Sequence, residues 1–166
     1  MGPMDFAALP MSRKKTSILF VCLANICRSP ALMATLKHLA IQRRLGDQIN
    51  VDSCGLGWYH LGEHPDRRVF ETAKKRGITI DHRAHQFEEK FFDEFDYIFA
   101  VDSEVVEQLK VQAKTEAHKK KIHLATAFSK KHKNQPISDP YYLSSGFEEI
   151  MDLIFDSCEG ILNHIA

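Results

Sequence analysis

The sequence predicts one doubly wound α/β domain, with a parallel sheet covered by helices on both faces. Short continuous apolar runs are typical of strands buried on both faces, and helical patterns separate these runs. No repeat, linker or low-complexity tract divides the 166 residues, a length that fits a single core. We therefore place one domain at residues 16–166 and treat residues 1–15 as an N-terminal extension, native or introduced.

The first half of the chain reads as strand, loop, helix, strand and helix. The apolar run at residues 17–23 predicts the first strand. Pro30 suits the first turn of a helix, and leucines at helical spacing extend that helix to about residue 44. Residues 50–54 predict a second strand. A helix then follows from Pro65 to about residue 76, where Gly77 ends it.

The second half predicts two more strands and the helices that cover them. In chain order we expect an extended segment at 79–81, a brief helix at 88–92, a buried strand at 96–101, a helix capped by Ser103 to about 113, a strand at 121–124 and a long final helix at 145–165. The final helix carries one continuous apolar stripe, which places Cys158 in the core as a structural thiol.

Composition excludes several classes of function. Lys plus Arg and Asp plus Glu number 22 each, so no overall field favours nucleic acid. No apolar run approaches the roughly 20 residues that span a bilayer. Four scattered cysteines do not make a disulfide scaffold, and nine dispersed histidines do not suggest a metal site. We expect a cytoplasmic protein without metal or cofactor. A monomer is the default, and exposed aromatic pairs could mediate weak self-association.

The interval between the first strand and the next helix has the properties of an anion-binding loop. It reads Cys22-Leu23-Ala24-Asn25-Ile26-Cys27-Arg28-Ser29. Ligands of open α/β sheets bind beyond the carboxyl ends of strands, where helix N-terminal N–H groups and the positive end of the helix dipole point. The sequence therefore predicts a phosphate site here.

The residue types in this loop suit phosphoryl transfer. Positive potential favours the thiolate of Cys22, the nucleophilic form of cysteine. Arg28 offers a rigid fork for two phosphoryl oxygens, and Ser29 can donate a hydrogen bond to the thiolate. Asn25 tolerates left-handed backbone angles. The alternative is that the loop has no function, with a buried cysteine at the end of a strand and an arginine on the surface. The position of the loop between a strand and a helix disfavours this alternative.

A proton donor for the leaving oxygen is expected at Asp139, in a polar loop before the final helix. Pro140 fixes the backbone beside this carboxylate, and Tyr141 and Tyr142 offer flat surfaces on which an aromatic ring can stack. Taken alone, Asp-Pro-Tyr is equally typical of a plain turn. Together with the phosphate loop it completes the set of groups that ester hydrolysis needs.

The run V-C-L-A-N-I-C-R-S-P together with D-P-Y-Y resembles the low-molecular-weight protein tyrosine phosphatases, over about residues 16–165. The resemblance implies a four-stranded parallel sheet in flavodoxin-like winding. It implies hydrolysis of phosphotyrosine in proteins through a cysteinyl-phosphate intermediate, with no metal or other cofactor.

The resemblance also implies a role for individual residues. Cys22 matches the nucleophile, Arg28 the phosphate clamp and Asp139 the general acid, and the residues expected to support the loop are Asn25, Ser29, Ser53, His82 and Asp102. His82 could equally be a solvated loop histidine. Cys27 matches a second loop cysteine that can trap oxidised Cys22 as a reversible disulfide, or it is a small filler beneath the loop.

Four residues bear on how closely the sequence follows the family. Ala24 stands where the family usually has glycine, so a positive φ there would be costly. Tyr59 stands at the position where the resemblance implies a tryptophan, and Trp58 precedes it, so either ring could wall the substrate pocket. Ile26 occupies a position where related protein arginine phosphatases carry threonine, which favours phosphotyrosine as substrate.

Two other functions fit the sequence less well. Arsenate reductases on this fold relay electrons through further cysteines after the third strand, and residues 82–94 contain no cysteine. A phosphoprotein-binding module that has lost catalysis would lack the nucleophile or the acid, whereas Cys22, Arg28 and Asp139 are all present.

Overall fold

The structure, a computed structural model, describes residues 15–139 and 146–166 and contains a four-stranded parallel sheet. The strands β1 (Thr16–Cys22), β2 (Ile49–Gly55), β3 (Tyr97–Ala100) and β4 (Ile122–Leu124) lie in the order β2-β1-β3-β4. This order confirms the flavodoxin-like winding. The chain moves from β1 to one side and later to the other, so the end of β1 is a topological switch point, where such sheets bind ligands.

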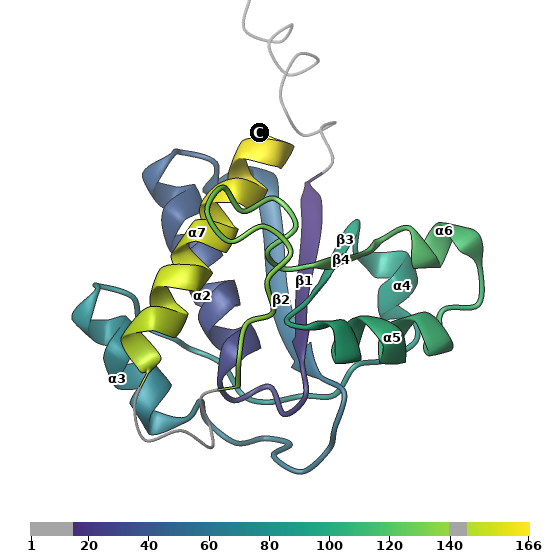
Figure 1. Cartoon of the computed structure of the whole chain (residues 1–166), viewed down its shortest axis with the longest axis horizontal. Coiled ribbons are helices and arrows are strands. Elements are labelled where there is room, and N and C mark those ends of the chain that lie inside the picture. Colours follow the sequence, from purple (N-terminus) through teal and green to yellow (C-terminus); the bar gives the residue numbers. More distant parts are fainter. Residues whose placement is uncertain (1–14, 140–145) are drawn as a thin grey trace, which may run out of the picture.

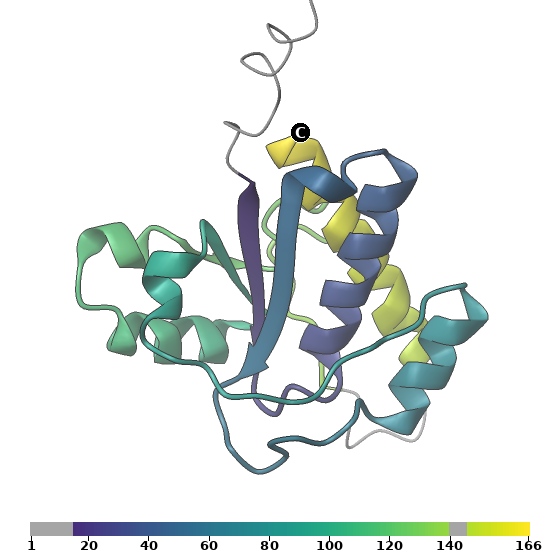
Figure 2. The same ribbon diagram turned by 180° about the vertical axis from the view of Figure 1, so that it is seen from behind.

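Helices cover both faces of the sheet. Helices α2 (Arg28–Gln42), α3 (Arg67–Lys75) and α7 (Phe147–Ile165) lie on one side, and α4 (Phe91–Glu94), α5 (Ser103–Gln112) and α6 (Glu116–Lys119) lie on the other (Figures 1 and 2). Coverage from both sides explains the continuous apolar run in β1, in which Ile18 to Cys22 are all buried. The predicted fold class is therefore confirmed.

Helix α2 begins two residues earlier than the sequence predicts, at Arg28 instead of Pro30. Pro30 then occupies the third helical position. A backbone N–H at this position would have no acceptor within the helix, so proline is tolerated there. Cys27 is the N-cap and makes no side-chain capping bond. Arg28 and Ser29 consequently lie in the buried first turn of the helix, directly beside the loop that they were expected to serve.

Other differences are local. Asp102, and not Ser103, caps α5, because its carboxylate accepts the N–H of Val105. The short helices Gly46–Gln48 and Glu116–Lys119 were not predicted, because they have too few residues to show a periodic pattern in the sequence. Cys158 is fully buried on α7, as expected. Within the described ranges, no helix combines the length and apolar character that a membrane span requires.

Candidate active site

A cavity of about 240 Å³ opens where β1 ends and α2 begins. Its lining residues are Cys22, Leu23, Ala24, Ile26, Cys27, Arg28, Tyr59, His60 and Asp139. The loop that joins β1 to α2 lies at the lower edge of the sheet in Figure 1, at the carboxyl ends of the strands. The structure thus brings the predicted phosphate loop and Asp139, 117 residues away in sequence (139 − 22), into one cavity.

Cys22 lies at the buried base of the loop, with 2% of its surface exposed. Its Sγ accepts the backbone N–H of Asn25 at 3.2 Å and lies 2.9 Å from Ser29 Oγ. Ser29 Oγ accepts a hydrogen bond from Asn25 Nδ2, and its single hydrogen can point to the sulfur at 2.9 Å or to the Cys54 carbonyl oxygen at 3.4 Å. The Asn25 N–H and the Ser29 hydroxyl therefore both lie within hydrogen-bond distance of Cys22 Sγ.

Asn25 holds the loop in shape through four side-chain hydrogen bonds. Its Nδ2 donates to Ser29 Oγ at 2.8 Å and to Ser53 Oγ at 3.0 Å. Its Oδ1 accepts from His82 Nε2 at 2.8 Å and from the backbone N–H of His85 at 3.0 Å. The side chain is buried, so these bonds satisfy all of its donors and acceptor sites away from water.

The left-handed residue of the loop is Asn25, with φ of 60°, and Ala24 has no positive φ. Asparagine is one of the few residues that adopt this conformation readily. A glycine at position 24 is therefore unnecessary here. The position that requires a glycine is Gly55, which packs closely against the loop, because a Cβ there would lie 2.7 Å from the Leu23 carbonyl oxygen.

Arg28 is held from behind. Its Nη1 donates to Asp102 Oδ2 at 2.9 Å and to the carbonyl oxygen of Ile137 at 2.8 Å. Its Nη2 lies 3.7 Å from Asp139 Oδ2, an ion pair at the cavity. The guanidinium is thus fixed along one edge, which leaves the Nη2 edge directed toward the cavity and Asp139.

Cys27 also lines the cavity and is 4% exposed. Burial, with the Asp66 and Asp139 carboxylates adding to it, raises the pKa of the Cys27 thiol well above its usual range. All four cysteines are free thiols. Cys27 therefore remains a protonated thiol at neutral pH.

Tyr59 lines the cavity and forms its aromatic wall. Trp58 is not a lining residue and stacks on Tyr59, with 5.3 Å between the ring centroids. Trp58 and Tyr59 are 66% and 61% exposed. Tyr141 and Tyr142, which were expected to contribute to the pocket, lie outside the described residues.

Several groups of the site had no role predicted from the sequence. His60 lines the cavity, the His85 N–H bonds Asn25, and the Ile137 carbonyl accepts from Arg28. The last two are backbone groups, which every residue carries, so no side-chain pattern could have identified them.

Comparison with known proteins gives the family. The profile of low molecular weight phosphotyrosine protein phosphatases matches residues 17–166. The chain belongs to this family. The phosphatase is 38% identical over 152 residues to the low molecular weight protein-tyrosine-phosphatase YfkJ of Bacillus subtilis, across 90% of this chain and 95% of the relative.

Solved structures of related enzymes superpose on this phosphatase. The protein tyrosine phosphatase of Entamoeba histolytica has a TM-score of 0.87 and 34% identity, covering 91% of this chain and 97% of the other. A Drosophila arginine phosphatase has a TM-score of 0.82 and 35% identity, covering 89% and 96%.

Proposed function

We propose that this phosphatase hydrolyses phosphotyrosine in proteins, with Cys22 as nucleophile, Arg28 as phosphate clamp and Asp139 as acid and base. The observation that carries the proposal is the placement of the Asn25 N–H and the Ser29 hydroxyl at Cys22 Sγ, inside a cavity that Arg28 and Asp139 also line. A nucleophile at the base of a cavity also suits a long, flat aryl ester better than a short alkyl one.

In the first step the Cys22 thiolate attacks phosphorus, and the bond from phosphorus to the aryl oxygen breaks. The leaving oxygen takes the proton of the Asp139 carboxyl, so a phenol leaves and a cysteinyl phosphate remains. General acid catalysis of this kind contributes about 10²–10⁴-fold. The loop amides at the start of α2 and the Nη2 edge of Arg28 would stabilise the transferring phosphoryl group.

In the second step Asp139, now a carboxylate, accepts a proton from water while the water oxygen attacks phosphorus. The sulfur–phosphorus bond breaks, inorganic phosphate leaves and Cys22 returns to the thiolate. Ser29 Oγ, 2.9 Å from Sγ, is placed to stabilise the sulfur as a leaving group. Asp102 and Ile137 act through Arg28, because they orient its guanidinium.

Dephosphorylation of arginine is the second candidate, because a Drosophila arginine phosphatase is among the structural relatives. Ile26 lines the cavity at the position where arginine phosphatases are expected to carry threonine. An apolar side chain here suits the apolar edge of an aryl ring. We therefore place phosphotyrosine ahead of phosphoarginine.

The test is hydrolysis of one peptide sequence carrying phosphotyrosine, phosphoserine or phosphoarginine. The proposal expects the wild type to prefer phosphotyrosine at least tenfold and Cys22→Ser to lose all turnover. Asp139→Asn should lose most activity on phenyl phosphate and less on p-nitrophenyl phosphate, whose leaving group needs less protonation. Full activity in Cys22→Ser would refute the mechanism, and a preference for phosphoarginine would refute the substrate.

We further propose that the catalytic domain spans residues 16–166, works as a monomer and acts on cytoplasmic phosphoproteins. The free state of all four cysteines supports a reducing compartment. The exposed pair Trp58 and Tyr59 at the rim of the cavity is suited to contact the protein part of a substrate.

A further inference from the structure

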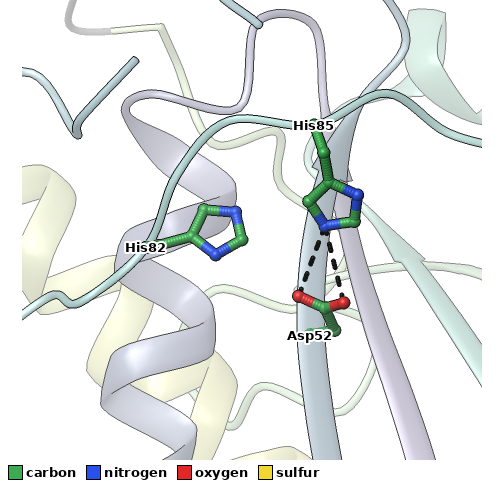
Figure 3. Close-up of side chains that lie close together, drawn as sticks. All are labelled: Asp52, His82 and His85. Atoms are coloured by element: carbon green, nitrogen blue, oxygen red, sulfur yellow. Dashed lines mark hydrogen bonds and ion pairs between the residues drawn. The ribbon is translucent and has the colours of Figure 1, made fainter. Parts of the chain in front are cut away.

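Asp52, His82 and His85 form a cluster on the supporting side of the phosphate loop (Figure 3). Asp52 projects from β2, and both histidines come from the segment that connects α3 to α4. One nitrogen of each imidazole and one oxygen of Asp52 lie within 4.8 Å of one another. The dispersed histidines of the sequence gave no sign of this grouping, since the strand and the connection meet only in the folded chain.

The tautomer of His82 follows from the hydrogen bonds of Asn25. The backbone N–H of His85 must donate, so the Asn25 atom that it meets at 3.0 Å is the oxygen. His82 Nε2 contacts the same oxygen at 2.8 Å and must therefore carry a hydrogen. In the neutral ring this leaves the lone pair on Nδ1. An imidazole that donates one N–H to a carbonyl oxygen and presents its other nitrogen is the usual state of a metal-binding histidine.

The spacing of Asp52 and His85 fits a shared ion better than a direct hydrogen bond. His85 Nε2 lies 3.5 Å from both Asp52 Oδ1 and Asp52 Oδ2. This is longer than the usual N–H···O distance of about 2.9 Å. Two ligands of a tetrahedral zinc ion with bonds of about 2.0–2.1 Å lie about 3.3 Å apart. The observed separation therefore requires little movement of either side chain to admit an ion.

The cluster is open to an incoming ion and fixed in place. The side chains of His85 and Asp52 are 37% and 43% exposed. The His85 ring packs edge-on against Phe91 at 6.1 Å, which limits its rotation. Among the neighbouring charges Glu88 favours a cation and Lys37 opposes it.

We propose that Asp52, His82 and His85 bind one divalent transition-metal ion, zinc being the best fit, with water in the remaining position. Two imidazoles and one carboxylate are a donor set that zinc accepts. The ion would hold His82 in the tautomer whose Nε2–H supports Asn25. Binding would therefore stabilise the phosphate loop from behind, through a residue that contacts neither substrate nor the reacting atoms.

The test is zinc binding by calorimetry, in a Cys22→Ser background because the Cys22 thiolate is itself a zinc ligand. The proposal expects one zinc ion per chain and a dissociation constant about tenfold or more weaker in Asp52→Asn and in His85→Gln. Both substitutions preserve the loop contacts, since an asparagine at position 52 keeps an acceptor for the Ser53 N–H and the His85 bond to Asn25 comes from the backbone. His38→Gln, a histidine on α2 outside the cluster, is the matched control and should leave the constant unchanged.

Equal affinity in all four proteins would overturn the site, as would a loss in His38→Gln equal to that in His85→Gln. Imidazole nitrogen NMR gives an independent readout. Zinc should shift the Nδ1 resonance of His82 while Nε2 stays protonated, and a zinc-induced loss of the Nε2 proton would overturn the coupling to Asn25. Because neither measurement uses turnover, failure here is distinguishable from failure of the proposed phosphatase mechanism.

Discussion

Replacement of Asn25 tests how much of the loop geometry depends on one side chain. Asn25→Ala removes four hydrogen bonds, to Ser29, Ser53, His82 and the His85 N–H. A buried hydrogen bond contributes about 1 kcal/mol net, so their loss costs about 4 kcal/mol. Alanine at φ of 60° adds about 1 kcal/mol of left-handed strain. The expected loss, about 5 kcal/mol, is a large fraction of the roughly 5–15 kcal/mol that stabilises a typical domain.

Asn25→Gly is the matched control, because glycine removes the same bonds and adopts the left-handed conformation without strain. Urea unfolding at low temperature should place its free energy of unfolding about 4 kcal/mol below wild type, and that of Asn25→Ala about 1 kcal/mol lower again. In both variants kcat/KM for p-nitrophenyl phosphate should fall about 100-fold, since the loop is no longer held in register. Stability within about 0.5 kcal/mol of wild type in both, the range of a neutral surface substitution, with unchanged kinetics, would refute the reasoning.

Three further outcomes are expected. Gly55→Ala places a Cβ 2.7 Å from the Leu23 carbonyl and 3.0 Å from Asn25 N, so kcat/KM should fall about 100-fold with the far-UV circular dichroism unchanged, and wild-type kinetics would contradict the contact. One molecule of peroxide should convert Cys22 to a sulfenic acid, which the Cys27 sulfur attacks with release of water, so dithiothreitol should restore the wild type; in Cys27→Ala a second peroxide should carry the sulfenic acid to the sulfinic acid, which dithiothreitol does not reduce, and equal recovery after prolonged peroxide would remove Cys27 from this role. Burial acts to raise the pKa of Asp156, but hydrogen bonds from Ser129, His132 and the Lys131 N–H outweigh burial and lower that pKa. Asp156→Asn should therefore lower the free energy of unfolding by about 1–2 kcal/mol at pH 7. That difference should vanish as pH falls below about 4 through the folded pKa, and a pH-independent difference would contradict the assignment.

Much of the fold could be predicted because β1 and β3 are apolar on both faces and α2 and α7 carry apolar residues at helical spacing. The start of α2 could not, since the helix begins at Arg28 with a polar first turn that shows no apolar periodicity. Helix α6 likewise could not be predicted, because its four residues are too few to show a periodic pattern. These differences follow from backbone hydrogen bonding, which leaves little trace in residue type.

In the candidate site, too, some features could be predicted from residue type and others could not. Cys22, Arg28 and Asp139 could be proposed from the sequence because thiol, guanidinium and carboxyl groups each suit one step of ester hydrolysis, and the structure brings them to one cavity. The left-handed angle at Asn25 agrees with the tolerance expected from its residue type, whereas the bond from the His85 N–H to its side chain depends on the folded connection and could not be predicted. The cluster of Asp52 with two histidines depends on a connection that crosses β2, and the sequence interval alone does not reveal it.

The most direct test of the central claim is to trap the phosphoryl group on the protein. Asp139→Asn slows the water attack more than the loss of a good leaving group, so it should accumulate the intermediate during turnover of p-nitrophenyl phosphate. Rapid quenching and mass spectrometry should then find one phosphoryl group on the peptide that contains Cys22 and none in Cys22→Ser. A phosphoryl group on another residue, or turnover in Cys22→Ser without any covalent intermediate, would contradict the account.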